Sequence, residues 1–145
     1  KKDDIGLVFT GLGSEEIFAG YERHSEAGDV NEECWKGLYT IFERDFTRDV
    51  KLGDNFGLRL GLPFLDIALV ESAMRIDASL KIKEGYKKYI LRKVAEELGV
   101  DKEFCWRKKK AAQYGSKANK EFMRIAKRNG FKTRKDFVRS ILCSG

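Results

Sequence analysis

The apolar and polar positions along the chain predict one short strand followed by a series of helices. Residues 5–9 form an apolar run with the length and composition of a buried strand. A glycine-containing turn at residues 10–14 follows, and apolar residues then recur at helical spacing between 17 and 21, behind Ser14 as the expected N-cap. Strand, glycine turn and helix in this order are typical of phosphate-binding corners in α/β proteins, because backbone N–H groups at the helix N-terminus point at the anion.

Two carboxylates in the first turn of that helix complicate a phosphate site. Glu15 and Glu16 complement the positive end of the helix dipole, but they repel a phosphate. A divalent cation such as Mg²⁺ between carboxylate and phosphate removes this conflict. The alternative is a tight strand–helix connection whose glutamates only match the dipole. The pattern leaves both interpretations open.

The remainder of the chain is expected to be helical. Helices are expected over about 31–46, 66–74, 87–98, 116–130 and 133–141. The expected N-caps of four of them are Asn31, Asp66, Ser116 and Thr133. The helix that begins at Asn31 is expected to bury one apolar face, made of Trp35, Leu38, Tyr39, Phe42 and Phe46. Gly53 to Gly61 is expected to be a break, and Asp101 to Gly115 a loop.

These elements predict a mainly α chain with one clear strand and about six helices. A lone buried strand leaves both of its edges unpaired, which is costly. Residues 5–9 therefore need partner strands from a further segment or from another copy of the chain. We expect residues 1–145 to be a single domain with a basic helical region at 116–145, and to be the later part of a larger α/β domain.

Composition narrows the class of protein. The 145 residues are 42% hydrophobic, and no stretch approaches the run of about 20 apolar residues that a membrane span needs. Cys34, Cys105 and Cys143 are odd in number and widely spaced, which fits neither a zinc site nor a disulfide framework and favours a cytoplasmic protein. The single histidine, His24, excludes a His-rich metal site. A charged share of 36% with one proline is typical of thermophile surfaces.

Charge is distributed unevenly along the chain. Residues 1–80 carry nine Lys/Arg and sixteen Asp/Glu, a net charge of −7, whereas residues 81–145 carry twenty and seven, a net charge of +13. A basic half indicates a polyanion such as nucleic acid or the phosphates of a nucleotide. The alternative is a solvated helix surface, because Lys and Arg are good helix formers.

Four segments, in order, resemble the synthetase domain of the asparagine synthetase family. They are residues 10–21, similar to Ser-Gly-Glu-Gly-x-Asp-Glu with a later Gly-Gly-Tyr; residues 44–66, which end in Pro-Phe-Leu-Asp; residues 85–92, similar to Gly-x-x-Lys-x-x-Leu-Arg; and residues 106–109, similar to the Arg-x-Lys signature. The resemblance covers residues 5 to about 116. Residues 110–116 are most similar to the asparagine synthetase domain-containing branch.

The resemblance implies an ATP-dependent, amide-forming ligase of the glutamine-hydrolysing family, with a role in asparagine and amino-acid biosynthesis. Members activate aspartate with ATP as an acyl-adenylate, release pyrophosphate and let ammonia attack. The implied fold is an α/β, adenine-nucleotide α-hydrolase-like sheet flanked by helices, of which this chain is the C-terminal part. The implied cofactors are ATP and Mg²⁺, and the implied substrate is an aspartate-like small molecule.

The family's site residues carry over by position. Glu15 and Glu16 are the implied contacts to Mg²⁺ through pyrophosphate, and Lys109 and Glu15 are the implied catalytic residues. Lys109 would stabilise charge on the phosphoryl oxygens. The implied nucleotide-binding residues are Thr10, Gly11, Gly13, Lys88 and Arg92. The alternative places Lys88 and Arg92 on a helix surface, with Arg92 in a structural ion pair, and makes Lys109 one charge in a solvated basic run.

The chain also departs from the family's pattern. The phosphate loop Ser-Gly-Gly-x-Asp-Ser and the glutaminase domain do not occur in it, so a preceding segment or a partner chain would supply the loop. Leu12 replaces a glutamate suited to accept a proton from ammonia, and Glu15 stands where the family has Asp. Two functions therefore remain open: an altered ligase, or a non-catalytic or RNA-binding relative that uses the basic half and its aromatic residues.

Overall fold

The computed structural model describes residues 5–108 and 115–143 and divides the chain into two compact units, Lys1–Trp106 and Arg107–Gly145. Lys109 lies outside the described residues. The first unit contains β1 (Leu7–Phe9), α1 (Ser14–Ile17), α2 (Glu22–Glu26), α3 (Val30–Ile41), the π-helical turn η1 (Phe42–Phe46), α4 (Thr47–Phe56), β2 (Arg59–Gly61), the 3₁₀ turn η2 (Pro63–Leu65), α5 (Ile67–Arg75), α6 (Ala78–Lys81), β3 (Ile82–Lys83), β4 (Tyr86–Lys87), α7 (Tyr89–Glu97) and α8 (Lys102–Trp106). The second unit contains α10 (Ala118–Arg128) and α11 (Arg134–Leu142). The mainly helical character expected from the sequence is confirmed.

The strand at the start of the chain finds a partner in a segment expected to be a break. β1 pairs in parallel with β2, with Leu7 opposite Arg59 and Phe9 opposite Gly61. The expectation that Gly53–Gly61 is only a break is therefore wrong, because α4 continues to Phe56 and β2 follows it. A strand of three residues carries too little periodicity to be distinguished from a loop.

β1 is exposed along its length, contrary to the expectation of a buried strand. Phe9 retains 71% of its surface exposed, although its ring lies across Gly61, where a Cβ would come within 2.4 Å of the ring. An apolar run of this kind is usually covered on both faces in a parallel sheet. Among the described residues, only β2 pairs with it.

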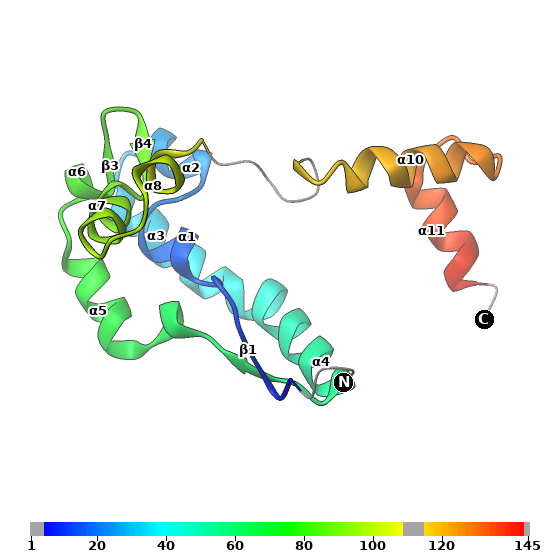
Figure 1. Cartoon of the computed structure of the whole chain (residues 1–145), viewed down its shortest axis with the longest axis horizontal. Coiled ribbons are helices and arrows are strands. Elements are labelled where there is room, and N and C mark those ends of the chain that lie inside the picture. The colour runs from blue at the N-terminus through cyan, green and yellow to red at the C-terminus, as the bar shows by residue number, and fades with distance from the viewer. Residues whose placement is uncertain (1–4, 109–114, 144–145) are drawn as a thin grey trace. The chain divides into compact units, whose positions relative to one another are not determined.

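The core of the first unit lies where α1, α5 and η2 meet. Ile17, Phe18 and Ala73 are buried, and the Phe18 and Phe64 rings meet edge to face with centroids 6.4 Å apart. Further apolar side chains from α3, α5 and α7 pack on this cluster: Leu38, Leu69, Val70, Met74, Ile90 and Leu91. Figure 1 shows α7 and α5 on one side of α1, and α3 running past it.

The helix expected over 31–46 is longer than expected, and of its expected apolar face Leu38 packs on the core while most of the rest stays exposed. α3, η1 and α4 follow one another without interruption from Val30 to Phe56, and they form one rod in Figure 1. The buried residues of α3 are Cys34, Gly37 and Ile41, whereas Trp35, Tyr39 and Phe42 of the expected core face stay 42%, 76% and 62% exposed. Small residues face inward there because α1 packs closely against α3.

Side-chain caps set several helix ends, two of them as expected. Asp66 accepts a hydrogen bond from the Leu69 N–H, and Thr133 accepts one from the Asp136 N–H. Asp29, not Asn31, caps α3 by accepting from the Glu32 N–H. Asn31 instead donates its side-chain amide to the Ile76 carbonyl at 3.2 Å.

Three further boundaries differ from the sequence prediction. The N-cap of α1 is Gly13, and Ser14 is already inside the helix. The segment expected to be a loop from Asp101 includes the helix α8, and Lys117 rather than Ser116 precedes α10 as its N-cap. Gly13 and Lys117 are N-caps by backbone conformation alone, since neither makes a side-chain cap hydrogen bond, and such boundaries shift by one or two residues with the definition used.

The second unit has a small apolar interface of its own. The Phe137 ring of α11 contacts Phe122 of α10 at 5.9 Å and Phe131 at 5.5 Å between ring centroids. Ala126 is fully buried at this interface. These contacts hold α10 and α11 together as a helical hairpin.

Candidate functional site

The turn after β1 is shaped by one glycine that tolerates no side chain. Gly13 has a φ of 94°, and a Cβ there would lie 2.5 Å from Leu65 Cδ2. Thr10 stabilises the turn by accepting a hydrogen bond from the Leu12 N–H at 3.2 Å, and its own N–H donates to the Gly61 carbonyl. Gly11 has open space around its Cα. The turn therefore positions α1 rigidly and leaves backbone accessible at Gly11.

Glu15 and Lys88, separated by most of the first unit in sequence, form an ion pair beside this turn. Lys88 Nζ lies 2.7 Å from Glu15 Oε1 and also donates to Ser14 Oγ at 3.0 Å. Both charged side chains are about one-fifth exposed, at 19% and 20%. Lys88 has a left-handed backbone (φ 57°) that ends β4 and begins α7, and this turn directs its side chain at α1.

Gly20 allows this ion pair to lie close to the backbone. A Cβ at Gly20 would lie 1.8 Å from Glu15 Oε2 and 2.6 Å from Lys88 Cε. Ala19, just before it, has a left-handed backbone with a φ of 56°. The chain thus turns sharply after α1, and the Glu15 carboxylate from the first turn of that helix packs against the backbone at Gly20.

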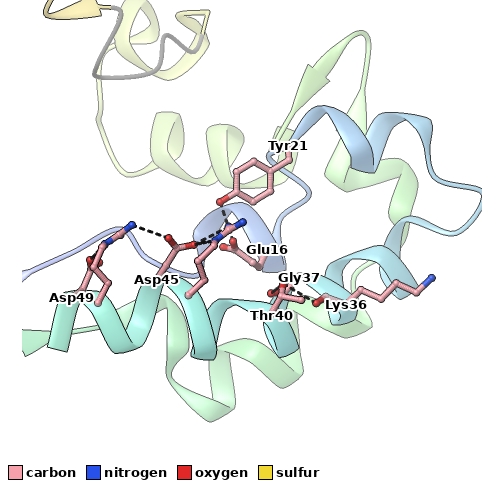
Figure 2. A network of polar contacts seen from close by, with 9 residues as sticks. Glu16, Tyr21, Lys36, Gly37, Thr40, Asp45 and Asp49 are labelled. Carbon is pink, nitrogen blue, oxygen red and sulfur yellow. Dashed lines mark hydrogen bonds and ion pairs between the residues drawn. The ribbon is translucent and has the colours of Figure 1, made fainter. Parts of the chain in front are cut away.

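Glu16 points away from Glu15 and toward Tyr21. It is only 2% exposed and accepts a hydrogen bond from the Tyr21 hydroxyl at 2.9 Å. Burial and the nearby negative charge of Glu16 raise the pKa of Tyr21 well above its ordinary value, so the phenol stays protonated as a donor. Figure 2 shows Glu16 and Tyr21 turned toward each other above α3.

Acidic side chains of the long rod flank the Glu16–Tyr21 contact. Asp45 and Asp49 lie on successive turns of η1 and α4 in Figure 2. Asp45 bridges Arg44 and Arg48 at 2.9 and 3.0 Å, and Arg48 also pairs with Asp49. The 44–49 segment of the family-like sequence is thus a surface ion-pair network.

Arg92 joins two helices rather than reaching the turn. Its Nε donates to the Lys87 carbonyl at 2.8 Å, and its Nη1 donates to the Cys105 carbonyl. The guanidinium also lies 5.9 Å from the centre of the Tyr86 ring. The nucleotide-binding role that the resemblance implies for Arg92 stays a prediction, as does the role of Lys109 outside the described residues.

Of the four aromatic residues that the nucleic-acid interpretation uses for stacking, Tyr86, Tyr89 and Trp106 pack against one another, and Tyr114 lies outside the described residues. Trp106 meets Tyr86 at 5.1 Å and Tyr89 at 5.5 Å between ring centroids, and its indole N–H donates to Glu96 at 2.9 Å. This cluster ties α8 to α7 and β4. Its rings serve packing within the first unit.

The carboxylates at the turn fit a cation only in part. Among residues 5–108 and 115–143, no group of three or more His, Cys, Asp or Glu side chains could hold a metal ion. Glu15 stands beside the turn but is paired with Lys88, and Glu16 is turned toward Tyr21. A Mg²⁺ ion bound largely by substrate phosphates needs only one or two protein carboxylates, which Glu15 can supply.

Two residues to which the sequence interpretation gave no role at the site, Ser14 and Tyr21, complete it. Ser14 accepts a hydrogen bond from the Lys88 ammonium, and Tyr21 donates one to the Glu16 carboxylate. The Gly20-Tyr21 dipeptide is part of the segment that carries the resemblance, and it marks the place where the Glu15–Lys88 pair meets the backbone. The presence of the motif was detectable in the sequence, whereas these contacts were not.

Comparisons with known proteins point to one family. The asparagine synthase family model matches residues 25–136. A Methanocaldococcus jannaschii protein named "putative asparagine synthetase [glutamine-hydrolyzing] 1" is 30% identical over 90% of this chain and 31% of its own length. The asparagine synthetase of Gallus gallus is 34% identical over 79% of the chain and 21% of its own length. The asparagine synthetase domain-containing protein YML096W of Saccharomyces cerevisiae is 31% identical over 79% and 22%.

The chain thus spans less than a third of the length of these curated relatives. In the part of the chain that the structure describes, no helix is both long and apolar enough to cross a membrane. Neither observation identifies a compartment, and the cytoplasmic location expected from the cysteines stays a prediction.

Proposed function

Because this chain belongs to the asparagine synthase family, we propose that it is the C-terminal part of an ATP-dependent ligase that adenylates the carboxylate of an aspartate-like amino acid and forms an amide. The observation that supports this most directly is the Glu15–Lys88 pair at the glycine turn after β1. A fixed ammonium and a carboxylate beside a helix N-terminus form a site that can exchange partners when phosphates arrive.

The ion pair has a defined role in this proposal. Lys88 would donate to a phosphoryl oxygen in place of Glu15, and Glu15 would then be free to contact Mg²⁺ bound to the same phosphates. Ser14 keeps the Lys88 ammonium at the turn during this exchange, since its hydroxyl accepts from Nζ independently of Glu15. Mg²⁺ would supply charge neutralisation to the phosphates.

Glu16 would contribute by position rather than by contact with the metal in this arrangement. Its carboxylate accepts a hydrogen bond from the Tyr21 hydroxyl, and Tyr21 directly follows Gly20 and is the N-cap of α2. Thr10 and Gly13 keep the turn in shape, and Gly11 exposes the backbone that would approach the nucleotide. Lys109 would stabilise charge on the phosphoryl oxygens.

The complete site requires more than this chain. The exposed apolar strand β1 needs further strands, and the Ser-Gly-Gly-x-Asp-Ser loop would come from a preceding segment or a partner chain. Leu12 cannot accept a proton, so ammonia would react without the general-base help worth about 10²–10⁴-fold in rate. We therefore expect weak asparagine formation from ammonia, with another acyl acceptor as the alternative.

The test is ATP–pyrophosphate exchange with aspartate, using the protein assembled with the segment that carries the phosphate loop. Glu15→Gln and Lys88→Met should each lower exchange by about 10²–10³-fold, as expected when one fixed charge contact is lost. The matched control is the neighbouring surface pair Lys87–Glu22, where Lys87→Met and Glu22→Gln should leave exchange within about 3-fold.

Equal effects at both pairs would contradict the site, and no exchange by the assembled wild-type protein would contradict the reaction. Lys109→Ala set beside Lys108→Ala extends the test to the basic segment. A selective loss for Lys109→Ala supports its catalytic role, whereas equal small losses assign it to a solvated surface.

A further inference from the structure

The second unit has an excess of positive charge that its own acidic residues do not offset. Residues 115–143 contain nine Lys/Arg and two Asp/Glu, a net charge of +7. Both acidic side chains already have partners within the unit. Asp136 accepts from the Thr133 hydroxyl at 2.6 Å at the start of α11, and Glu121 pairs with Arg124 at 2.5 Å. The remaining cations are therefore available to an external anion.

One face of α10, together with Lys117 just before it, gathers four of the unit's cations in a row, and Arg124 among them pairs with Glu121. Lys117, Lys120, Arg124 and Lys127 recur every three or four residues and line a groove of about 640 Å³. At a rise of about 1.5 Å per residue, the row extends over about 15 Å. Side chains at this spacing lie on the same side of a helix.

The opposite face of α10 is already occupied. Phe122 contacts Phe137, and Ala126 is fully buried against the rest of the hairpin. A helix that lies in a membrane surface needs its apolar face free to enter the lipid. α10 instead presents its charged row outward and uses its apolar side to hold α11.

We propose that this row on α10 binds the phosphate backbone of single-stranded RNA. A single line of cations follows one strand of phosphates, and unpaired strands in cells are chiefly RNA. The residues that line the groove include no aromatic ring, and Trp106 and its neighbours are packed within the first unit. Binding therefore depends on charge and has little base preference. This activity is independent of the ligase reaction and holds with or without it.

The test is titration of the 145-residue chain with a fluorescent oligouridine RNA of about 20 nucleotides at salt from about 50 to 200 mM. Lys120→Ala and Lys127→Ala should each weaken binding several-fold and reduce the slope of log affinity against log salt by about 0.7. Lys51→Ala is the matched control, because Lys51 is an exposed helix lysine of the first unit. It should leave affinity and slope unchanged.

Misfolding of the lysine variants could also weaken RNA binding, so the test includes a variant that is expected to bind RNA more tightly. Glu121→Gln removes the acid in the row and releases Arg124, so it should tighten RNA binding several-fold. Equal losses for Lys51→Ala and Lys120→Ala, no effect of Glu121→Gln, or no binding at the lowest salt would overturn the proposal. Tighter binding to duplex DNA or to phosphatidylserine vesicles than to the RNA would also overturn it.

Discussion

Gly20 illustrates how a residue without a side chain determines the candidate site. The carboxylate of Glu15 and the stem of Lys88 occupy the volume where a Cβ would be. Any larger residue must displace the ion pair or the backbone of α1. The family-like Gly-Tyr dipeptide is thus explained by packing at this position.

Gly20→Ala is expected to destabilise the first unit by about 1–3 kcal/mol, because an overpacked site forces neighbouring atoms to shift. Gly28→Ala is the control, since a Cβ at Gly28 meets nothing within 4 Å. Urea unfolding of both variants measures the difference. Equal stabilities would show that the Glu15–Lys88 pair yields easily and that Gly20 is not required for it.

His24 links stability to pH at a single, identifiable residue. It is fully buried, and its Nδ1 accepts from the Tyr21 N–H at 3.0 Å, so the ring is held neutral. Burial lowers the pKa of His24 below its ordinary value of 6.5. The unfolded chain therefore binds a proton at a higher pH than the folded chain does.

The free energy of unfolding should consequently fall as pH decreases below about 6.5, toward the lowered pKa of folded His24. His24 is the only histidine, so the urea midpoint of His24→Gln should vary less than that of the wild type over this range. Denaturation series at several pH values measure both. An unchanged pH dependence in His24→Gln would assign the effect to other groups.

At the scale of elements, helix ends are determined locally and strand pairing is not. Asp66 and Thr133 cap helices as expected, because capping depends on residues within one turn. β2 was missed because its pairing depends on β1. The two strands lie more than 50 residues apart in sequence, with Leu7 opposite Arg59. The strand itself is only three residues long.

Asp66→Ala tests one such cap. It should lower the stability of the first unit by about 1 kcal/mol, because the Leu69 N–H loses its acceptor. Asp54→Ala, in the last turn of α4, is the comparison and should cost less, since an acidic group near a helix C-terminus opposes the dipole. Thermal unfolding monitored by circular dichroism gives both values, and a larger loss at Asp54 would refute the capping argument.

At the scale of the whole molecule, this chain exposes apolar surface that a complete α/β domain would cover. Phe9 on β1 and Tyr39 on α3 are 71% and 76% exposed. The free edge of an apolar strand is also a template for pairing with another chain. Either a further segment or a second copy of the chain can pair with this free edge and cover it.

The isolated chain is therefore expected to self-associate with rising concentration, and Phe9→Lys should reduce the association. Leu98→Lys is the matched control, because Leu98 is 80% exposed but lies at the end of a helix. Sedimentation velocity at several concentrations distinguishes the two variants. Equal behaviour of both would show that general surface apolarity, and not the strand edge, drives association.

The sequence by itself determined the helical character, two of the helix caps and the family, because periodicity, capping and motifs are written over short stretches of chain. It also singled out Glu15 and Lys88, separately, as candidate site residues. Only the tertiary structure decided that these two side chains form one ion pair with Ser14, that Glu16 turns to Tyr21, and that β1 pairs with β2. Those contacts join positions far apart in sequence or depend on which way a side chain leaves the backbone, and both are set by the path of the folded chain.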